Sequence, residues 1–197
     1  KAVRDTVEAA AEIGIKFLTL YAFSTENWNR PKSEVNALMG LLISAIKKET
    51  QNLMKNNIKL SAIGETNSLP EKARKELSEA IQNTKKNTRM TLILALSYSG
   101  RWDILNATKS LIQNGIPAKN IDEKLFQQYL ATESVPDPEL LIRTSGEYRI
   151  SNFLLWQSAY SELYFTDTLW PDFRKTNLKK AIIDYQKRER RFGKTKA

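Results

Sequence analysis

The chain has 197 residues, 41% of them hydrophobic and 27% charged, which is the composition of one ordinary globular domain. It contains no cysteine and no histidine, so these residues cannot form a disulfide framework, a Cys/His zinc site, a cysteine nucleophile or a catalytic histidine. Any chemistry must use carboxylates, amides, hydroxyls, arginines or an oxygen-bound metal. The formal net charge of +9 indicates an anionic partner: nucleic acid, acidic lipid or a phosphorylated small molecule.

The apolar runs along the chain are short. The longest, such as residues 91–96, cannot cross a bilayer, and the first residues lack the charged-then-apolar order of a signal peptide. The absence of cysteine suits a reducing compartment. We therefore expect a cytoplasmic protein, with peripheral contact at the inner face of the membrane left open. Because Lys1 already lies in an amphipathic pattern, we also expect further residues upstream.

Helical and strand patterns alternate along the chain. Strands are predicted from β-branched and aromatic runs, and helices from apolar residues at helical spacing behind a capping residue. The predicted elements, in chain order, are an opening helix ended by Gly14, a buried strand 15–23, a helix 34–56 capped by Ser33, a strand 58–63, a helix from Ser68 and Pro70 to 86, a strand 90–96, a helix 103–114, a helix capped by Asp122 and ending near 131, a strand 139–143, a helix 153–160, a strand 163–166 and a basic helix 177–190.

This alternation, with no tight hairpin signal between the strands, predicts an α/β fold. We expect a single domain with a mostly parallel central sheet and helices on both faces. Ligands of such sheets bind at the carboxyl ends of the strands. Polar segments follow three of the predicted strands, at residues 24–30, 97–101 and 143–151, so the functional site is expected there.

The segment 143–151 places two arginines and several hydroxyls around Gly146. An arginine fork matches phosphate geometry, and backbone N–H groups with serine hydroxyls can complete an anion cradle. The alternative is that Arg143 and Arg149 pair with Glu147 and other acids on a solvated loop, where such pairs contribute little. The residues alone favour neither interpretation.

Trp28 lies among polar residues directly after an apolar strand. One interpretation is a mobile binding loop in which Trp28 closes over a substrate while Asn27 and Arg30 contact its polar groups. The other is that Trp28 is a hydrophobic plug in front of the next helix. Local sequence slightly favours the plug.

Three further features have two interpretations each. Glu162 follows an aromatic-rich segment, where a carboxylate needs a metal, an arginine or a hydrogen-bond donor. The helix 34–56 carries a second apolar face at Leu41 and Ala45, suited to core packing or to a cavity for a hydrocarbon. The basic stretch 179–192 is either a solvated helix, which we favour, or a surface for anionic headgroups or nucleic acid.

Four segments carry long and specific motifs. They are AFSTENWNRP at 22–31, SGRWD at 99–103, IRTSGEYRISNFLLWQ at 142–157, and ELYF followed by LWPD within 162–172. Together they resemble the bacterial cis-prenyltransferases, from Lys1 to the tail at 188–193. Two positions depart from the family's usual pattern: Tyr148 stands where bacterial members usually carry His, and Ser145 where a second Gly is usual.

The resemblance implies an enzyme that condenses isopentenyl diphosphate repeatedly onto farnesyl diphosphate with Mg²⁺. Cis double bonds would form and diphosphate would be released, giving a long-chain polyprenyl diphosphate of undecaprenyl type, the precursor of a cell-wall lipid carrier. The resemblance also implies a hydrophobic tunnel, a homodimer, and peripheral contact with the membrane for product release. It implies no nucleic-acid partner.

Site residues follow from the same resemblance. Arg143, Arg149 and Ser151 would hold the diphosphate of isopentenyl diphosphate, with Ile150 in the same loop. Glu162 would help to bind Mg²⁺.

The catalytic role would fall to Asn27, in removing a proton from the condensing isopentenyl unit. The apolar face of the helix 34–56 would line the tunnel for the product. A flexible loop would order over the allylic substrate and the growing chain, and its substrate-binding residues would be Ser24, Thr25, Glu26, Trp28 and Arg30.

By the resemblance, the family's first strand and its Asp-Gly-Asn-Gly-Arg loop lie upstream of Lys1. We therefore expect residues 1–197 to be one domain that lacks this strand and phosphate-binding loop, and that is inactive by itself. One alternative is a catalytically inactive accessory subunit, which the intact arginine and glutamate motifs disfavour. A basic nucleic-acid-binding domain is disfavoured because no helix-turn-helix, RNP or zinc-finger pattern is present.

Overall fold

In the computed structural model, which describes residues 1–189, the chain divides into two units. The first is formed by Lys1–Ala10 together with the chain from Asp137 onward, and the second by Ala11–Pro136. Each unit contains a parallel sheet and helices, so the predicted α/β class is confirmed. The predicted basic helix 177–190 is too long, because α6 (Lys175–Gln186) ends at Gln186, and residue 190 lies outside the described residues.

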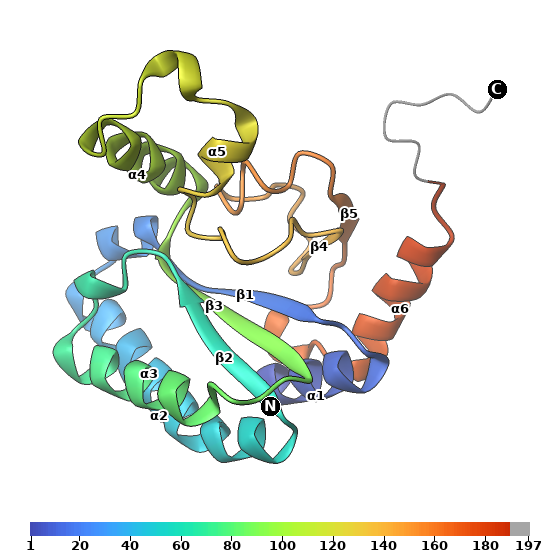
Figure 1. Ribbon diagram of the computed structural model, residues 1–197. Helices are drawn as coiled ribbons and strands as arrows, with labels where there is room; N and C mark the ends of the chain where they lie inside the picture. The colour runs from blue at the N-terminus through green and yellow to red at the C-terminus, as the bar shows by residue number, and fades with distance from the viewer. Residues whose placement is uncertain (190–197) are drawn as a thin grey trace. The chain divides into compact units, whose positions relative to one another are not determined.

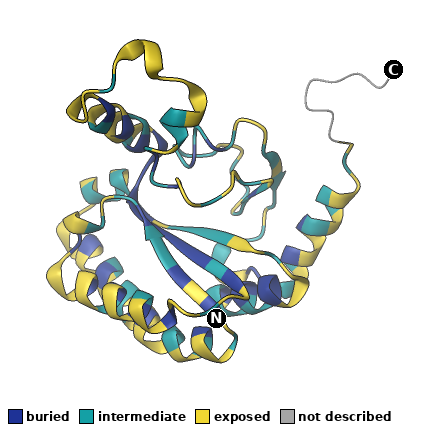
Figure 2. Ribbon diagram, viewed as in Figure 1, coloured by how far each residue is buried: buried dark blue, intermediate teal, exposed yellow. Residues whose placement is uncertain are grey.

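The unit 11–136 is built on three parallel strands in the order β1-β3-β2 (Figure 1). They are β1 (Phe17–Ser24), β2 (Ile58–Ile63) and β3 (Met90–Tyr98). Every residue of β3 except Thr91 is buried, because a strand paired on both edges and covered by side chains has the least access to water (Figure 2). The predicted strand 58–63 is confirmed, and the predicted strand 90–96 continues to Tyr98.

The burial predicted for the first strand is wrong. Within β1 only Phe23 is buried, and Phe17 is 40% exposed. The reason is its position: β1 pairs with β3 on one side, and among residues 1–189 no strand pairs with its other side. An apolar run predicts a strand but not whether both of its edges are covered.

Helices of this unit are α2 (Lys32–Lys55), α3 (Glu71–Thr84), α4 (Gly100–Gln113) and α5 (Glu123–Gln127). In Figure 1, α2 and α3 lie side by side on one face of the three-stranded sheet, and both contact β2. Their outward sides are largely exposed (Figure 2). They therefore cover one sheet face with a single buried stripe each.

Three predicted helix boundaries need correction. Ser33 does not cap α2, because Pro31 occupies the N-cap position and places Ser33 inside the helix. The helix predicted from Asp103 begins earlier, at Gly100, because the Ser99 side chain accepts a hydrogen bond from the Trp102 N–H. Asp122 caps α5 as predicted, but this helix ends at Gln127 and not near 131.

Thr84 ties the end of α3 to the outer edge of β2. Its hydroxyl donates to the Ala80 carbonyl at 2.8 Å and accepts the Leu60 N–H at 3.0 Å. Thr84 is 0% exposed, so these bonds replace ones that water cannot supply. The Thr84 hydroxyl thus accepts the Leu60 N–H, a backbone donor of the edge strand that no neighbouring strand within residues 1–189 accepts.

A buried carboxylate joins three segments near the start of α4. The Tyr98 hydroxyl donates to Asp103 Oδ2 at 2.9 Å, and the Ala131 N–H donates to Asp103 Oδ1 at 2.8 Å. Asp103 is only 1% exposed. A buried charge is tolerated here because both of its oxygens accept hydrogen bonds.

The other unit contains α1 (Ala2–Ile13) up to Ala10, β4 (Leu140–Arg143), β5 (Glu162–Phe165) and α6 (Lys175–Gln186). β4 and β5 form a two-stranded parallel sheet in which Leu140 pairs with Glu162 and Arg143 with Phe165. Asp5 of α1 pairs with Arg174 just before α6, at 3.3 Å. The predicted opening helix and both short strands are confirmed.

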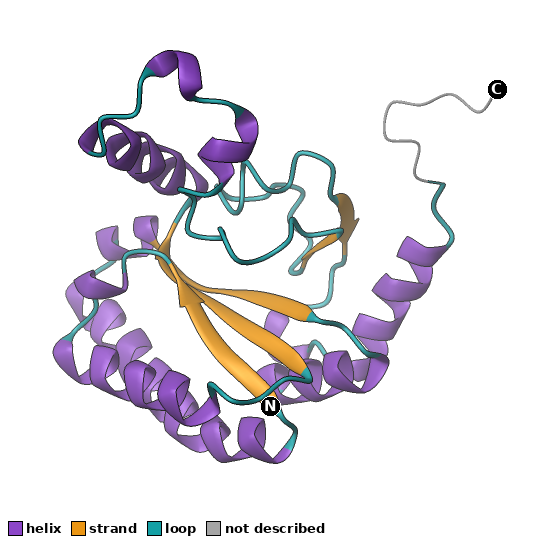
Figure 3. Cartoon of the chain, in the orientation of Figure 1, coloured by secondary structure: helices purple, strands orange, loops and turns teal. Residues whose placement is uncertain are grey.

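The helix predicted at residues 153–160 is wrong. The connection between β4 and β5 contains turns and bends and is drawn as loop in Figure 3. Ser151, Asn152 and Leu154 have φ values of 51°, 60° and 45°. A right-handed helix requires negative φ, so these residues interrupt it.

Candidate functional site

The segment after β1 forms a short 3₁₀ helix, η1 (Thr25–Asn29). Asn27, the predicted catalytic residue, accepts the Ser24 N–H on Oδ1 at 2.9 Å. Its amide oxygen therefore caps the start of its own turn in this conformation. A short polar side chain suits this position because it satisfies a donor that the helix cannot.

The outer residues of η1 make surface contacts. The Thr25 hydroxyl donates to Glu26 at 3.2 Å, and Arg30 pairs with Glu34 at 2.5 Å. The side chains of Arg30 and Glu34 are 48% and 46% exposed. This is an ordinary helical i,i+4 ion pair of small energetic value.

Trp28 makes two contacts with the sheet, which agree with the plug interpretation, and its closing over a substrate stays a prediction. Its ring packs edge-to-face on Phe23, with centroids 4.9 Å apart, as a hydrophobic plug would. Its Nε1–H also donates to Ser97 Oγ at 2.9 Å. Ser97 was not identified as a site residue from the sequence, although a serine inside the apolar end of β3 was a usable signal.

Tyr21, on β1, lies next to this turn. Its hydroxyl donates to the Tyr98 carbonyl at 3.0 Å. Burial, and then the negative charge of Glu26, raise the pKa of Tyr21 to about 12, while a hydrogen bond with Ser24 lowers it. Tyr21 is therefore a neutral donor throughout the physiological pH range.

Arg143 and Arg149 have different environments. Arg149 is exposed and pairs with Glu147, as the solvated-loop interpretation expected. The Nε of Arg143, at the end of β4, is buried and has no hydrogen-bond partner. Buried donors are nearly always satisfied, so an orphaned guanidinium nitrogen indicates a site for an anionic acceptor.

The backbone of the loop that follows Arg143 is unusual. Non-glycine residues seldom adopt the left-handed region, which costs about 1 kcal/mol or more each and is found most often at functional sites. Two N–H groups fix the start of the loop: Ser145 N donates to the Thr168 carbonyl and Gly146 N to the Thr166 carbonyl, both at 3.0 Å. The positive φ values are Ser145 72°, Gly146 66°, Ser151 51°, Asn152 60° and Leu154 45°.

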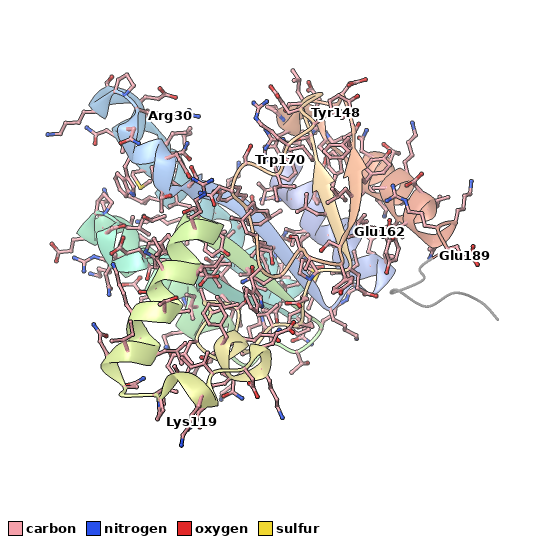
Figure 4. All side chains as sticks on the ribbon, turned by 90° about the horizontal axis from the view of Figure 1, so that it is seen from above. Arg30, Lys119, Tyr148, Glu162, Trp170 and Glu189 are labelled. Atoms are coloured by element: carbon pink, nitrogen blue, oxygen red, sulfur yellow. The ribbon has the colours of Figure 1, made fainter. Side chains whose placement is uncertain are left out.

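Glu162 lies at the opposite end of the two-stranded sheet from Arg143. Three residue steps along β5 separate it from Phe165, the register partner of Arg143, a distance of about 10 Å. Tyr148 packs on Phe165 with centroids 5.2 Å apart, and Figure 4 shows Tyr148 and Glu162 toward opposite ends of the sheet. The described unit therefore does not bring Glu162 to the arginine loop.

Arg188 forms a salt bridge with the Glu162 carboxylate. Arg188 Nη1 donates to Glu162 Oε2 at 2.8 Å and to the Leu163 carbonyl at 2.9 Å, and the same guanidinium binds Asp184. Hydrogen bonding to Glu162 is the main cause that raises the pKa of Arg188. Of the partners expected for this carboxylate, the structure provides an arginine.

The described residues offer few ligands for a divalent metal. Within residues 1–189, no three Asp or Glu side chains cluster closely enough to hold an ion. Mg²⁺ is commonly bound by one or two carboxylates with substrate phosphates and water, so Glu162 alone could supply one ligand. These residues by themselves do not form a metal centre.

The predicted site residues thus fall into three groups. The first group lies in the turn after β1: Ser24, Thr25, Glu26, Asn27, Trp28 and Arg30. The second lies at the end of β4 and in the loop that follows it: Arg143, Arg149, Ile150 and Ser151, where the Ile150 carbonyl accepts the Phe153 N–H at 3.1 Å. The third is Glu162 alone, at the start of β5.

The second apolar face of α2 is not part of the core. Leu41 is 67% exposed and Ala45 is also exposed, whereas the buried residues of α2 are Val35, Met39, Ile46 and Leu53. The core-packing interpretation therefore fails for this face. Its role in lining a cavity stays a prediction.

Over residues 1–189, every helix is too short or too polar to traverse a lipid bilayer.

The sequence was compared with known proteins. Residues 1–193 match the prenyltransferase family model described as "Putative undecaprenyl diphosphate synthase". The isoprenyl transferase of Chlorobaculum tepidum is 55% identical over 199 residues, covering 99% of this chain and 75% of that protein. The ditrans,polycis-undecaprenyl-diphosphate synthase ((2E,6E)-farnesyl-diphosphate specific) of Pasteurella multocida is 53% identical over 197 residues, covering 98% of this chain and 82% of that protein.

Solved structures agree with the sequence comparison. Lavandulyl diphosphate synthase from Lavandula x intermedia, in complex with dimethylallyl diphosphate, matches with a TM-score of 0.94 at 38% identity, covering 98% of this chain and 85% of that one. A probable undecaprenyl diphosphate synthase from Campylobacter jejuni matches with a TM-score of 0.89 at 36% identity, covering 98% and 90% of the two chains. The orphaned arginine, the strained loop and these matches lead to one conclusion: the chain belongs to the undecaprenyl diphosphate synthase family of prenyltransferases.

Proposed function

We propose that this protein elongates a prenyl chain by adding isopentenyl diphosphate units to farnesyl diphosphate, giving a long-chain polyprenyl diphosphate of undecaprenyl type. In each step a carbon–carbon bond forms, the allylic carbon–oxygen bond breaks, diphosphate leaves, and the isopentenyl unit loses a proton. The product would be a lipid-carrier precursor for cell-wall synthesis. The observation that supports this proposal most directly is the buried, unpaired Nε of Arg143 in a chain of this family.

In this proposal the loop after β4 binds the diphosphate of isopentenyl diphosphate. Arg143 would donate Nε–H to a phosphate oxygen. Arg149 would leave its exposed partner Glu147 and donate to another phosphate oxygen of the same diphosphate. Ser151, held with φ at 51°, and Ile150 would shape the cradle. Because the loop is already strained into place, little ordering would be needed on binding.

Asn27 would act in proton removal and the rest of η1 would cover the allylic substrate. An amide oxygen accepts hydrogen bonds but does not keep a proton near neutral pH, so Asn27 would orient and relay the proton. An amide oxygen can accept two hydrogen bonds, so Oδ1 can keep the Ser24 N–H while it contacts the isopentenyl unit.

Mg²⁺ would, when bound, neutralise the charge of the diphosphate group. Among the described residues only Glu162 is assigned to it, and Arg188 would have to move away from that carboxylate first.

We also propose a homodimer that contacts the membrane peripherally. Exposed large apolar side chains of the C-terminal unit include Tyr160 (78%), Leu169 (56%) and Ile183 (51%). Such side chains suit an interface with a second copy. The net charge of +9 favours contact with anionic headgroups during product release.

The test is elongation of farnesyl diphosphate with labelled isopentenyl diphosphate and Mg²⁺, followed by chromatography of the extracted lipid. The complete gene product and the 197-residue chain are assayed side by side. Arg143→Ala should lower kcat/KM for isopentenyl diphosphate by about 10- to 100-fold, the value of a charged hydrogen bond. Arg74→Ala, which removes an exposed arginine on α3, is the matched control and should leave activity unchanged.

Long labelled polyprenyl diphosphate from the complete protein, reduced in Arg143→Ala only, would support the proposal. No elongation by the complete protein would overturn it and favour the accessory-subunit alternative. Equal losses in Arg143→Ala and Arg74→Ala would refute the specific role of Arg143 and show a general charge effect.

A further inference from the structure

Side chains from three separate segments meet at the carboxyl ends of β1 and β3. Trp28 Nε1 donates to Ser97 Oγ at 2.9 Å, Ser97 Oγ lies 2.9 Å from Ser68 Oγ, and Ser68 Oγ donates to the Glu65 carbonyl at 2.7 Å. Each hydroxyl has one hydrogen, so the arrangement that uses every donor once runs from the indole through both serines to the carbonyl. We call this chain of hydrogen bonds the indole latch.

The backbone around the indole latch is irregular on all three strands. The β1–β3 register shifts between Tyr21 and Ser24, and Ser97 on β3 has a φ of 48°. Directly after β2, Gly64 has a φ of 106° and packs against β3 so closely that an added Cβ would lie 2.1 Å from the Leu96 carbonyl oxygen. Bulges and strained residues gather where a sheet must hold functional groups at fixed positions.

Ser97 has a backbone conformation that strains serine, so its presence there suggests that its hydroxyl has a role. Glycine would adopt a φ of 48° without the steric cost, but it could not accept the indole N–H. Ser97 is 1% exposed, so its hydroxyl is shielded from competing water. The strain is retained together with the one group that can anchor Trp28.

The turn held by the indole latch is not part of the buried core. η1 contains no buried residue, and Trp28 contacts the sheet through its indole bond to Ser97 and through its ring on Phe23. A turn with so little buried surface depends strongly on each specific contact.

We infer that the indole latch positions η1, and that Ser97 is the positioning residue for Asn27. The effect on catalysis rests on the proposed function, whereas the effect on the indole does not. Without the Ser97 hydroxyl, the indole N–H loses its acceptor and the turn that carries Asn27 samples more conformations.

The first experiment observes the latch directly by ¹⁵N–¹H NMR of the tryptophan indoles. The Trp28 resonance is the one lost in Trp28→Phe. Ser97→Ala and Ser97→Gly should shift this resonance and speed its hydrogen exchange by about 10-fold, within the range that one lost hydrogen bond allows. Ser97→Asn should restore slow exchange, because asparagine tolerates positive φ and offers an amide oxygen.

Tyr21→Phe is the matched control. It removes the hydrogen bonds of the Tyr21 hydroxyl to the Tyr98 carbonyl and to Ser24, but keeps every member of the latch. It should leave the exchange of the Trp28 indole unchanged. If Ser97→Ala fails to fold, Ser68→Ala and Ser97→Asn still test the latch at the same resonance.

The second experiment measures elongation kinetics. Ser97→Ala and Ser97→Gly should lower kcat by about 10-fold with little change in KM for isopentenyl diphosphate, and Ser97→Asn should recover most of kcat. Full activity and slow indole exchange in Ser97→Gly would overturn the inference, since the serine would then matter only for its backbone. If no variant and no wild-type protein elongates, the proposed function fails, and indole exchange alone decides the latch.

Discussion

Gly64→Ala is the substitution for which the structure predicts the largest cost without touching any side chain of the site. Gly64 has a φ of 106°, and an added Cβ would lie 2.1 Å from the Leu96 carbonyl oxygen and 3.0 Å from Tyr98 Cβ. A residue held in a sparsely populated backbone region costs about 1–3 kcal/mol, and displacing packed backbone costs about 1–3 kcal/mol more. We therefore expect a loss of about 4 kcal/mol in the free energy of unfolding.

The assay is equilibrium unfolding in urea, with two glycine controls in the same chain. Gly115 has a φ of 66° and open space around it, so Gly115→Ala should cost only about 1 kcal/mol from backbone strain. Gly40 lies within α2 with nothing near its Cβ position, so Gly40→Ala should stabilise by about 0.5–1 kcal/mol. If Gly64→Ala costs no more than Gly115→Ala, the close approach of β2's end to β3 is not rigid and the reasoning is refuted.

Three other outcomes follow from buried polar groups. Thr84→Val keeps the shape but leaves the Leu60 N–H without its acceptor, so urea unfolding should show a loss of about 1–3 kcal/mol, and an unchanged midpoint would contradict this role. Asp103→Leu removes the acceptor of the buried Tyr98 hydroxyl and of the part-buried Ala131 N–H and should cost about 3 kcal/mol or more in the same assay, whereas a neutral result would show that water replaces the carboxylate. For Tyr21, tyrosinate absorbance should show one group titrating near pH 12 that is missing in Tyr21→Phe. Below pH 10 both the folded and the unfolded chain keep the proton of Tyr21. Between about pH 10 and 12 the unfolded chain loses this proton first, so the free energy of unfolding falls as the pH rises. Tyr21→Phe removes this contribution to the pH dependence.

Much of the fold could be predicted because local patterns determine it. The strand 58–63 alternates apolar and polar residues over its first half, the strand 139–143 has a short apolar run, and the helix ended by Gly14 has helical spacing; the structure confirms all three within a few residues. The helix predicted at 153–160 is wrong for a local reason that the spacing of apolar residues does not reveal. Apolar spacing there is helical, but the left-handed backbone of residues such as Leu154 diverts the chain.

The candidate site could be located but not resolved from sequence. The motifs lie at the ends of β1 and β4, where ligands of parallel sheets usually bind. The bond of Arg188 to Glu162 spans 26 residues, and that of Trp28 to Ser97 spans 69. Contacts at such separations depend on tertiary packing, so no local pattern distinguishes Arg143, with its orphaned nitrogen, from Arg149, with its surface partner.

The side of β1 that has no strand partner within residues 1–189 has a consequence for the behaviour of this chain in solution. Residues 17–22 are uncharged and contain no proline, and on that side their N–H and C=O groups have no strand partner within residues 1–189. Natural proteins usually guard such edges with lysine, proline or a bulge, and here the register shift protects only the stretch from Tyr21 to Ser24. The first half of β1 is consequently a template for intermolecular strand addition, and preparations of this 197-residue chain should aggregate at high concentration through β-structure.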